Sequence, residues 1–447
     1  DVYKRQREGL YFYSMAIGFA LLGDSELANR WPSVAWSTIL VALMYVYGRT
    51  LFRSERLGIL SAGITAVLFW PVVFAHIGLR AISMPVIMIP ALLGLLLALR
   101  ASSDRRAFTV SIWGGIFAGL TAYTYTAGRG FPAVVALFLL YAALTQRYML
   151  RRRWRALLVY VIVMIFVSAW LYVYLHLHPD YDVRIGTAKM GMDLLLKGDI
   201  KIFLTQIVDT LGMFTVRGEP NPLWNIIGRP VFVGPEGWVF YLGVLLCLWR
   251  VRKPEYALQL IVLATMLVPS VLTAHPPSWT RSIGMLPALL VVTVLPVEWA
   301  WSAIGNWASK RSSGTPSDVL RRKVALPVYA ALVLVLGLSI YARTYTDLFD
   351  IWMDHPEAYW MSDAYYDETA HYINRSPDST PLNFVADWYV PWRKTNLERP
   401  IQRKDVAVRW TIKNAFVFPD DPGGLRVAFQ VLAAPTSALL EAFLNPD

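Results

Sequence analysis

The chain has 447 residues, of which 56% are hydrophobic and only 16% are charged. Its mean hydropathy of +0.43 is far above that of a water-soluble domain, so the composition excludes a soluble globular protein and predicts a polytopic membrane protein. The formal net charge of +11 would suggest nucleic-acid binding in a soluble protein. Here most of the positive charge lies in short segments between apolar runs, where membrane topology requires it, and no nucleic-acid partner is expected.

The first residues, DVYKRQ, are neither a signal peptide nor a plausible beginning for the hydrophobic pattern. We therefore expect the chain to be a fragment that lacks its true N-terminus. The single cysteine, Cys247, lies within the apolar run GWVFYLGVLLCLW. This position excludes a disulfide within one monomer and predicts a buried thiol.

Ten segments are long or apolar enough to cross about 30 Å of hydrocarbon. They are centred on residues 31–48, 57–76, 82–99, 108–125, 131–145, 156–177, 236–249, 256–273, 283–304 and 324–342. An eleventh run, LYFYSMAIGFALL at 10–22, has only 13 residues and is predicted to be re-entrant or to lie on the membrane. The expected fold class is therefore an all-α polytopic bundle with about 10–11 membrane segments.

The distribution of Lys and Arg assigns the two sides of the membrane. Nineteen of these residues fall in five loops on one side, as is typical of cytoplasmic loops. The short loops on the other side hold one arginine each, namely Arg30, Arg80, Arg129 and Arg281. We expect that other side to be the outer face of a multi-pass protein of the cell (cytoplasmic) membrane, so Arg80 is not a topology signal.

Two longer segments are also predicted to lie outside. Residues 178–235 start polar, continue through an amphipathic helix around 190–213 and end in a loop rich in Pro, Gly and Asn. The tail combines a helix around 356–375 with the β-like runs PLNFVADWYV, VAVRWTI and LRVAFQVLA. We therefore expect a membrane domain at 1–343, with the large outer loop 178–235, and a small α+β extracytoplasmic domain at 344–447.

Three of the outer arginines share a local context with helix-breaking residues. Arg80 lies in LRAISMP, Arg129 in TAGRGFP and Arg281 in PPSWTRS. A guanidinium offers a planar fork of donors that suits phosphate oxygens, so several of them around one outward cavity would hold a lipid phosphate at headgroup depth. The alternative is that each arginine merely extends to a lipid headgroup as an anchor.

The 178–235 segment also supplies carboxylates and further cations. Asp180, Asp182 and Glu219 are candidates for a base that deprotonates an acceptor hydroxyl, while cations would stabilise a departing phosphate. The additional cations of this segment are Arg184, Arg217 and Arg229. Solvated loop charge is the alternative explanation for any one of these residues.

Metal chemistry has one weak candidate, HLHPD, in which His176, His178 and Asp180 are close in sequence. Because histidines at this spacing do not share a helix face, no metal site is predicted, and a divalent ion stays possible without support. Nucleophile triads, P-loops and dinucleotide-binding loops are absent from the sequence. The WGG at 113–115, within a predicted span, indicates close helix packing.

Several short motifs occur together in the first 300 residues. They are REGLYF at 7–12, LG at 22–23, RWPS at 30–33 and GRTLF at 48–52, followed by HIGLRAISMP, AYTYTAGRGFP, NPLWNIIGRPVF and HPPSWTRSIGMLP. In this combination they resemble the GT-C membrane glycosyltransferases, the group that contains protein O-mannosyltransferases and the undecaprenyl-phosphate aminoarabinose transferase. The later motifs are similar to bacterial members of the dolichyl-phosphate-mannose mannosyltransferase-like branch (glycosyltransferase family 39-like).

The resemblance implies a hexosyl or pentosyl transferase that moves a sugar, with inversion, from a polyprenyl-phosphate carrier to a hydroxyl acceptor at the outer face. The acceptor would be a protein, a lipid or a cell-envelope glycan, and the partners would be the carrier and membrane lipids. The family's general base, an Asp on the first outer loop, would lie upstream of residue 1, so no catalytic residue is assigned and this fragment is expected to lack it. Candidate ligands of the donor phosphate are Arg7, Arg80, Arg129 and Arg281, and candidate acid/base or acceptor residues are Glu8, Asp180, Asp182 and Glu219.

Two other classes of protein fit the composition. A secondary transporter or flippase-like protein is also an all-helical membrane bundle, but transporters place ionisable groups near the bilayer midplane on broken helices. Here the span interiors are nearly free of charge, which favours an interfacial enzyme. A non-catalytic scaffold whose outer domain binds a partner also stays open, whereas a transferase is expected to have a cavity that reaches from lipid to water beneath the 178–235 loop.

Overall fold

The computed structural model describes residues 9–23, 25–178, 197–311, 324–361, 364–386, 401–412 and 426–429. The chain divides into two compact units, Asp1–Trp352 and Met353–Asp447. The boundary expected at 343/344 falls inside helix α17 (Leu326–Tyr345), which continues through a π-helical segment, η8 (Thr346–Trp352), to the end of the first unit. The side of the membrane on which each unit lies stays a prediction.

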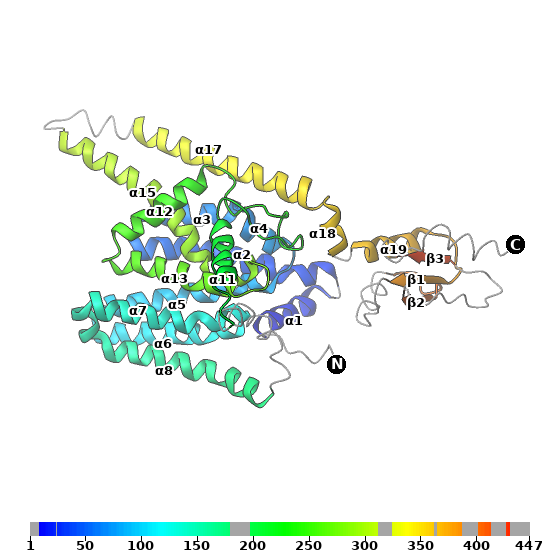
Figure 1. Ribbon diagram of the computed structural model, residues 1–447, viewed down its shortest axis with the longest axis horizontal. Helices are drawn as coiled ribbons and strands as arrows, with labels where there is room; N and C mark the ends of the chain where they lie inside the picture. Colours follow the sequence, from blue (N-terminus) through cyan, green and yellow to red (C-terminus); the bar gives the residue numbers. More distant parts are fainter. Residues whose placement is uncertain are drawn as a thin grey trace. The chain divides into compact units, whose positions relative to one another are not determined.

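The first unit is a helical bundle (Figure 1). Its longer helices are α2 (Glu26–Phe52), α5 (Ser83–Arg100), α6 (Asp104–Leu120), α7 (Phe131–Thr145), α8 (Arg147–Leu177), α13 (Pro254–Val271), α15 (Leu286–Arg311) and α17. Its shorter helices are α1 (Leu10–Leu22), α3 (Glu55–Val67), α4 (Phe69–His76), α11 (Ile200–Gly212), α12 (Glu236–Trp249) and α14 (Trp279–Ser282). The 3₁₀ turns among the described residues are η2 (Arg80–Ile82), η3 (Thr121–Tyr123), η4 (Thr126–Gly130) and η6 (Ile283–Met285).

Every predicted membrane segment is helical in the structure, although the one at 57–76 forms two helices, α3 and α4. Within the described residues, seven helices are long and apolar enough to cross a membrane, or up to eight if the bent pair α3–α4 counts as one span. The segments predicted at 108–125 and 236–249 form α6 and α12, which have 17 and 14 residues. The run at 10–22 is α1, a 13-residue apolar helix. The all-helical polytopic fold is therefore confirmed.

The segment predicted as one span at 57–76 is bent by 53° between α3 and α4. Proline explains the break, because Pro71 lacks the N–H that would bond to the carbonyl of Val67 one turn earlier. The hydroxyl of Thr344, on α17, donates a hydrogen bond of 2.7 Å to that Val67 carbonyl. A polar group that the bend exposes within the bundle is thus satisfied by a neighbouring helix, as an apolar environment requires.

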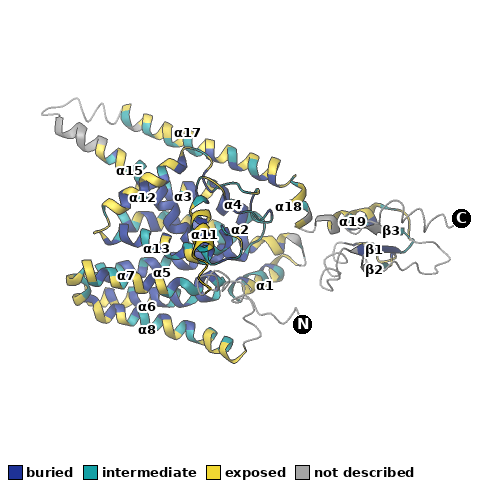
Figure 2. Ribbon diagram, in the orientation of Figure 1, coloured by how far each residue is buried: buried dark blue, intermediate teal, exposed yellow. Residues whose placement is uncertain are grey.

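Helix α5 lies at the centre of the bundle, whereas α8 and α17 show exposed residues along their outer sides (Figure 2). α5 packs closely against α6 at a pair of glycines, since a Cβ atom at Gly94 would lie 2.5 Å from the Cα of Gly114. On the other side of α6, Gly115 and Gly119 contact α8 near Tyr160 and Val167. The close packing expected from the WGG motif is therefore present, and small residues permit it.

The second unit contains α18 (Pro356–Met361), α19 (Ala364–Arg375) and the strands β1 (Leu382–Ala386), β2 (Val408–Ile412) and β3 (Arg426–Phe429). The sheet order is β2-β1-β3, and both pairings are parallel. Each β-like run of the sequence contains one of these strands. The small core of this unit consists of Ala370, Ile373, Leu382, Phe384, Ile401 and Val406.

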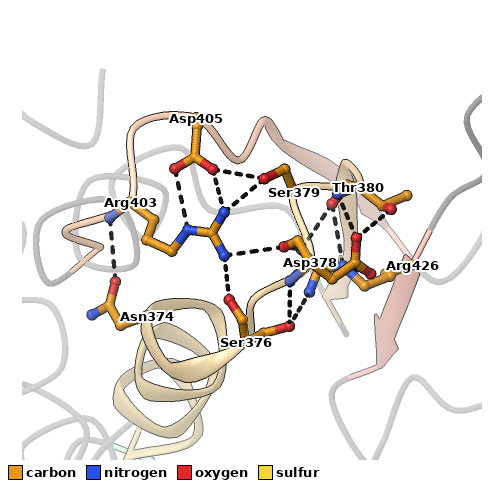
Figure 3. A network of polar contacts seen from close by, with 8 residues as sticks. All are labelled: Asn374, Ser376, Asp378, Ser379, Thr380, Arg403, Asp405 and Arg426. Atoms are coloured by element: carbon orange, nitrogen blue, oxygen red, sulfur yellow. Dashed lines mark hydrogen bonds and ion pairs between the residues drawn. The ribbon is translucent and has the colours of Figure 1, made fainter.

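A polar network closes the sheet at the end where the three strands begin (Figure 3). Arg403 pairs with Asp405 and donates a hydrogen bond of 2.7 Å to the hydroxyl of Ser379, and the guanidinium lowers the pKa of Asp405. Arg426 donates to the carbonyl of Thr380 at 2.8 Å and to that of Asp378 at 3.0 Å. These arginine contacts are satisfied within the unit and join the start of β1 to β3 and to the segment before β2.

Candidate functional site

The helical bundle has two ends with different polar chemistry. At one end, which we name the opposite end, arginines near the helix termini pair with carboxylates in Arg49–Glu55, Arg56–Glu298, Arg100–Glu255 and Arg153–Asp104. The other end, which we name the site end, is formed by η2, η4, α14 and residues 213–235. Most of the described sequence-predicted site residues lie there.

Arg80 begins η2 at the site end and is only 8% exposed. Its guanidinium lies over the ring of Tyr125, with 5.2 Å between Cζ and the ring centroid. The hydroxyl of Ser83 donates a hydrogen bond of 2.8 Å to the Arg80 carbonyl and so ties this turn to the start of α5. A headgroup anchor would extend into solvent, so the burial of Arg80 argues against the snorkelling alternative.

Arg129 lies in η4, which directly follows Tyr125, the residue whose ring contacts Arg80. The turn is tight, because a Cβ atom at Gly128 would collide with the carbonyl oxygen of Thr121. The Thr121 hydroxyl in turn contacts the Gly128 carbonyl at 3.4 Å. η4 packs against α13, α14 and η6, so the turn that carries Arg129 contacts the helix that carries Arg281.

Glu219 connects the 213–235 loop to α14. Its carboxylate is 4% exposed and accepts a hydrogen bond of 2.7 Å from the backbone N–H of Trp279, the first residue of α14, and one of 3.4 Å from that of Asn221. Burial raises the pKa of Glu219 to about 7, while the two N–H groups, the Ser278 hydroxyl and the charge of Arg281 oppose this rise. The carboxylate thus caps a helix 60 residues away in sequence and lies within the field of Arg281.

The loop around Glu219 is closed by its own backbone. Gly218 N–H donates to the Gly228 carbonyl at 3.0 Å, and Gly228 N–H donates to the Glu219 carbonyl at 3.1 Å. Gly228 has a φ of +73°, which favours glycine there. The Asn225 amide crosses the loop and donates to the carbonyls of Glu219 and Arg229 at 3.0 and 2.8 Å. Glu219 is therefore presented by a rigid turn.

A second set of contacts fixes the same loop to α17 and η8. Arg229 forms an ion pair of 2.6 Å with Asp347 and lies over the ring of Phe69 at 4.2 Å. The indole N–H of Trp352 donates to the Pro222 carbonyl at 2.7 Å. Arg229, which the sequence offered as a further cation for a phosphate, is instead paired with a carboxylate.

Aromatic side chains pack against the first residue of α14, the helix that carries Arg281. The rings of Trp70 and Trp279 are buried, with centroids 5.2 Å apart, and Phe69 contacts Trp279 at 6.3 Å. Within the described part of the chain, the Nη1 atom of Arg281 is buried and has no hydrogen-bond partner. An acceptor-rich anion would satisfy such a donor. Sequence reasoning missed Phe69 and Trp70, although the FWP run that ends nine residues before Arg80 was the available signal.

Four predicted residues, Arg7, Glu8, Asp180 and Asp182, lie outside the described residues, so the roles assigned to them stay predictions. The HLHPD candidate is only partly described: His178 stacks on Tyr174 at 4.4 Å, and Asp180 is not among the described residues. In the described ranges, no group of three or more His, Cys, Asp or Glu side chains is arranged to hold a metal ion.

Comparisons with known proteins agree with this architecture. Residues 10–173 match the family model of the dolichyl-phosphate-mannose-protein mannosyltransferases. No curated protein matches the chain in a sequence comparison.

Two solved structures of ArnT from Cupriavidus metallidurans share the fold. For ArnT bound to undecaprenyl phosphate, the TM-score is 0.52 at 15% identity, with 90% of this chain and 79% of ArnT covered. For apo ArnT, the TM-score is 0.54 at 14% identity, with 91% and 75% covered. At such identities the likeness concerns the fold alone. The chain therefore has the fold of the GT-C glycosyltransferases, and its predicted resemblance to that superfamily is confirmed without the subfamily being fixed.

Proposed function

We propose that this protein transfers a sugar from a polyprenyl-phosphate carrier to a hydroxyl-bearing acceptor at the outer face of the cell membrane, with inversion at the sugar. The observation that carries the proposal is the chain of contacts at the site end: Arg80 on Tyr125, the η4 turn of Arg129 on α14, and Arg281 beside Glu219. The fold supports it, because ArnT with the same fold was crystallised with undecaprenyl phosphate.

In an inverting transfer, the acceptor oxygen attacks the anomeric carbon from the face opposite the phosphate, which leaves with the bonding electrons. The negative charge grows on the phosphate, so the protein accelerates the step by placing fixed positive groups there. Guanidinium groups in a partly buried site suit this task, since they hold phosphate oxygens with several donors each. We assign this role to Arg80, Arg129 and Arg281, with Arg7 as a further candidate.

Glu219 fits a positioning role better than that of general base. Both of its oxygens accept backbone N–H groups and its side chain is buried, whereas a general base must reach the acceptor hydroxyl. By holding the first residue of α14, it orients the helix that carries Arg281. The base therefore stays unassigned, with Glu8, Asp180 and Asp182 as the candidates.

Binding of undecaprenyl phosphate to the purified protein in lipid nanodiscs tests the proposal without knowledge of the sugar or the acceptor. Because a hydrogen bond to a charged group is worth about 1.5–3 kcal/mol, Arg281→Ala and Arg129→Ala should each weaken binding about tenfold or more. Arg49→Ala, at the opposite end, is the matched control and should leave the affinity unchanged. Equal losses in all three variants, or equal binding of undecaprenol without phosphate, would show that these arginines do not recognise the carrier phosphate.

A further inference from the structure

Helix α11 (Ile200–Gly212) has three chemically different sides, and among the described residues one of them packs against the rest of the protein. The side that packs against α13 carries Gln206 and Thr210, both buried. The amide of Gln206 donates a hydrogen bond of 3.2 Å to the carbonyl of Thr273. The inward contact of this helix is therefore partly polar and fixes its orientation about its own axis.

α11 shows exposed residues (Figure 2). Ile200, Leu204, Val208 and Leu211 form an apolar stripe on its outward side. These residues recur at intervals of four, four and three, which places them on one face of a helix. Their side chains are 61%, 54%, 66% and 51% exposed. In a helix that rests on a protein surface in water, the apolar residues would be the buried ones, so this stripe requires an apolar environment outside the protein.

Beside the apolar stripe runs a polar strip formed by Lys201, Thr205 and Asp209, all exposed and spaced by four residues. The charges of Lys201 and Asp209 are opposite, so the strip has no net charge. A helix with an apolar side and an adjacent polar side suits the boundary between hydrocarbon and water, where the two sides face different solvents. A helix immersed in hydrocarbon would not carry the polar strip.

The residues that follow α11 place its end beside the start of an apolar helix of the bundle. Thr215 contacts the hydroxyl of Tyr241, on α12, at 2.9 Å. The neighbouring Val216 and Trp238 are 77% and 76% exposed. Trp and Tyr are enriched where membrane helices meet the headgroup layer, so the exposed residues near the end of α11 have the composition of a membrane interface.

We propose that α11 lies in the membrane–water interface, with Ile200, Leu204, Val208 and Leu211 inserted among the lipid chains and Lys201, Thr205 and Asp209 facing water. The partner is thus the lipid bilayer itself, bound through apolar contact and without a requirement for anionic lipids. The rigid turn of Glu219 begins five residues after α11 ends, so the bilayer surface helps to hold the loop that caps α14. This inference does not depend on the proposed transferase activity.

Depth-dependent fluorescence quenching of the full chain in liposomes tests this placement. The buried Cys247 is replaced by Ala, and single cysteines are introduced at Leu204 and Val208 on the apolar stripe or at Thr205 and Asp209 on the polar strip. Each is labelled with an environment-sensitive dye and quenched by lipids brominated at shallow or deep positions of the acyl chain. Phe166→Cys on α8, a 66% exposed position, is the control for a membrane-spanning surface.

Because interfacial helices bury their apolar face about 5–10 Å deep, shallow bromolipids should quench the dyes at Leu204→Cys and Val208→Cys about twofold, and deep bromolipids should quench them less. The dyes at Thr205→Cys and Asp209→Cys should be almost unaffected, and phosphatidylglycerol should not alter the pattern. Equal quenching on both sides of the helix would overturn the proposal. So would an absence of quenching at Leu204→Cys, or crosslinking of that cysteine between two copies of the chain, since a protein partner would then cover the stripe.

Discussion

The two ends of the helical bundle differ in the partners of their arginine side chains. At the opposite end, Arg49 lies 2.7 Å from Glu55 and Arg56 lies 3.3 Å from Glu298, and Arg100 and Arg153 pair with Glu255 and Asp104. At the site end, Arg229 and Arg343 also pair with carboxylates, but the buried carboxylate of Glu219 binds backbone N–H groups. A buried donor atom of Arg281 has no hydrogen-bond partner among the described residues.

This difference separates two uses of positive charge. Four described arginines of the opposite end pair with carboxylates, and the number of Lys and Arg residues in its loops is the one expected of a topology signal. At the site end, Arg80, Arg129 and Arg281 lie in short turns or a one-turn helix and are buried or partly buried. A guanidinium in such a place gains more from a ligand anion than it would in water. A surplus of arginine is therefore a poor guide to where an anion binds, and the state of pairing is a better one.

The largest expected effect comes from a buried arginine pair at the site end, Arg229–Asp347. Asp347→Ala should lower the free energy of unfolding by about 3–5 kcal/mol, because removing one partner of a buried pair leaves an uncompensated charge, and the Arg229 side chain is only 9% exposed. Reversible unfolding in mixed micelles measures this loss. The control is Asp350→Ala, an exposed position one turn later in the same segment, and equal losses in the two variants would show that the pair is not buried in the folded protein.

A smaller effect should distinguish Glu219 from the paired carboxylates of the opposite end. Burial raises its pKa to about 7 from an ordinary value of 4.5, so between these pH values the folded chain binds more protons at this site than the unfolded chain. Stability from this residue is therefore present at low pH and should fall by about 2–3 kcal/mol as the pH rises from 4.5 to 7.

The measurement is the free energy of unfolding of the wild type and of Glu219→Gln across that range. Other groups titrate in both proteins, so the informative quantity is the difference between the two pH profiles. In the Glu219→Gln variant, the free energy of unfolding should lack the part of the decrease with pH that is due to Glu219. Profiles of equal slope would mean that the carboxylate is hydrated in the folded protein.

The sequence was sufficient for the positions of the helices and for the separation of the two ends, because both follow from local properties. Apolar runs place the spans, and the alternation of Lys- and Arg-rich loops puts Arg80, Arg129 and Arg281 together at one end. The sequence shows a proline at position 71, but it does not show that the helix breaks there. Proline within a membrane span is tolerated when a neighbouring group forms a hydrogen bond to the freed carbonyl. Which neighbour does so, here Thr344, depends on the tertiary contact.

The partners of the charged groups could not be predicted from the sequence, because they too depend on tertiary contacts. Glu219 and Trp279 are 60 residues apart, and Arg229 and Asp347 are 118 apart. No periodicity links such pairs. From the sequence, Arg229 was therefore interpreted as a further cation for a phosphate and Glu219 as a candidate base. Trp70 was missed because a buried tryptophan in an apolar run has the same local pattern whether it packs in a core or behind a site.

The smallest expected effect concerns the exposed pair Arg49–Glu55, and it sets the baseline for the comparison. Both side chains are more than half exposed, at 54% and 58%, so water and salt screen their attraction. A double-mutant cycle of Arg49→Ala and Glu55→Ala should give a coupling of at most about 0.5 kcal/mol, and less at high salt. A coupling above about 2 kcal/mol, a value typical of buried pairs, would remove the energetic contrast between the ends. A weak coupling would mean that the charges of the opposite end can vary at little cost to stability, provided that their sign is kept for topology.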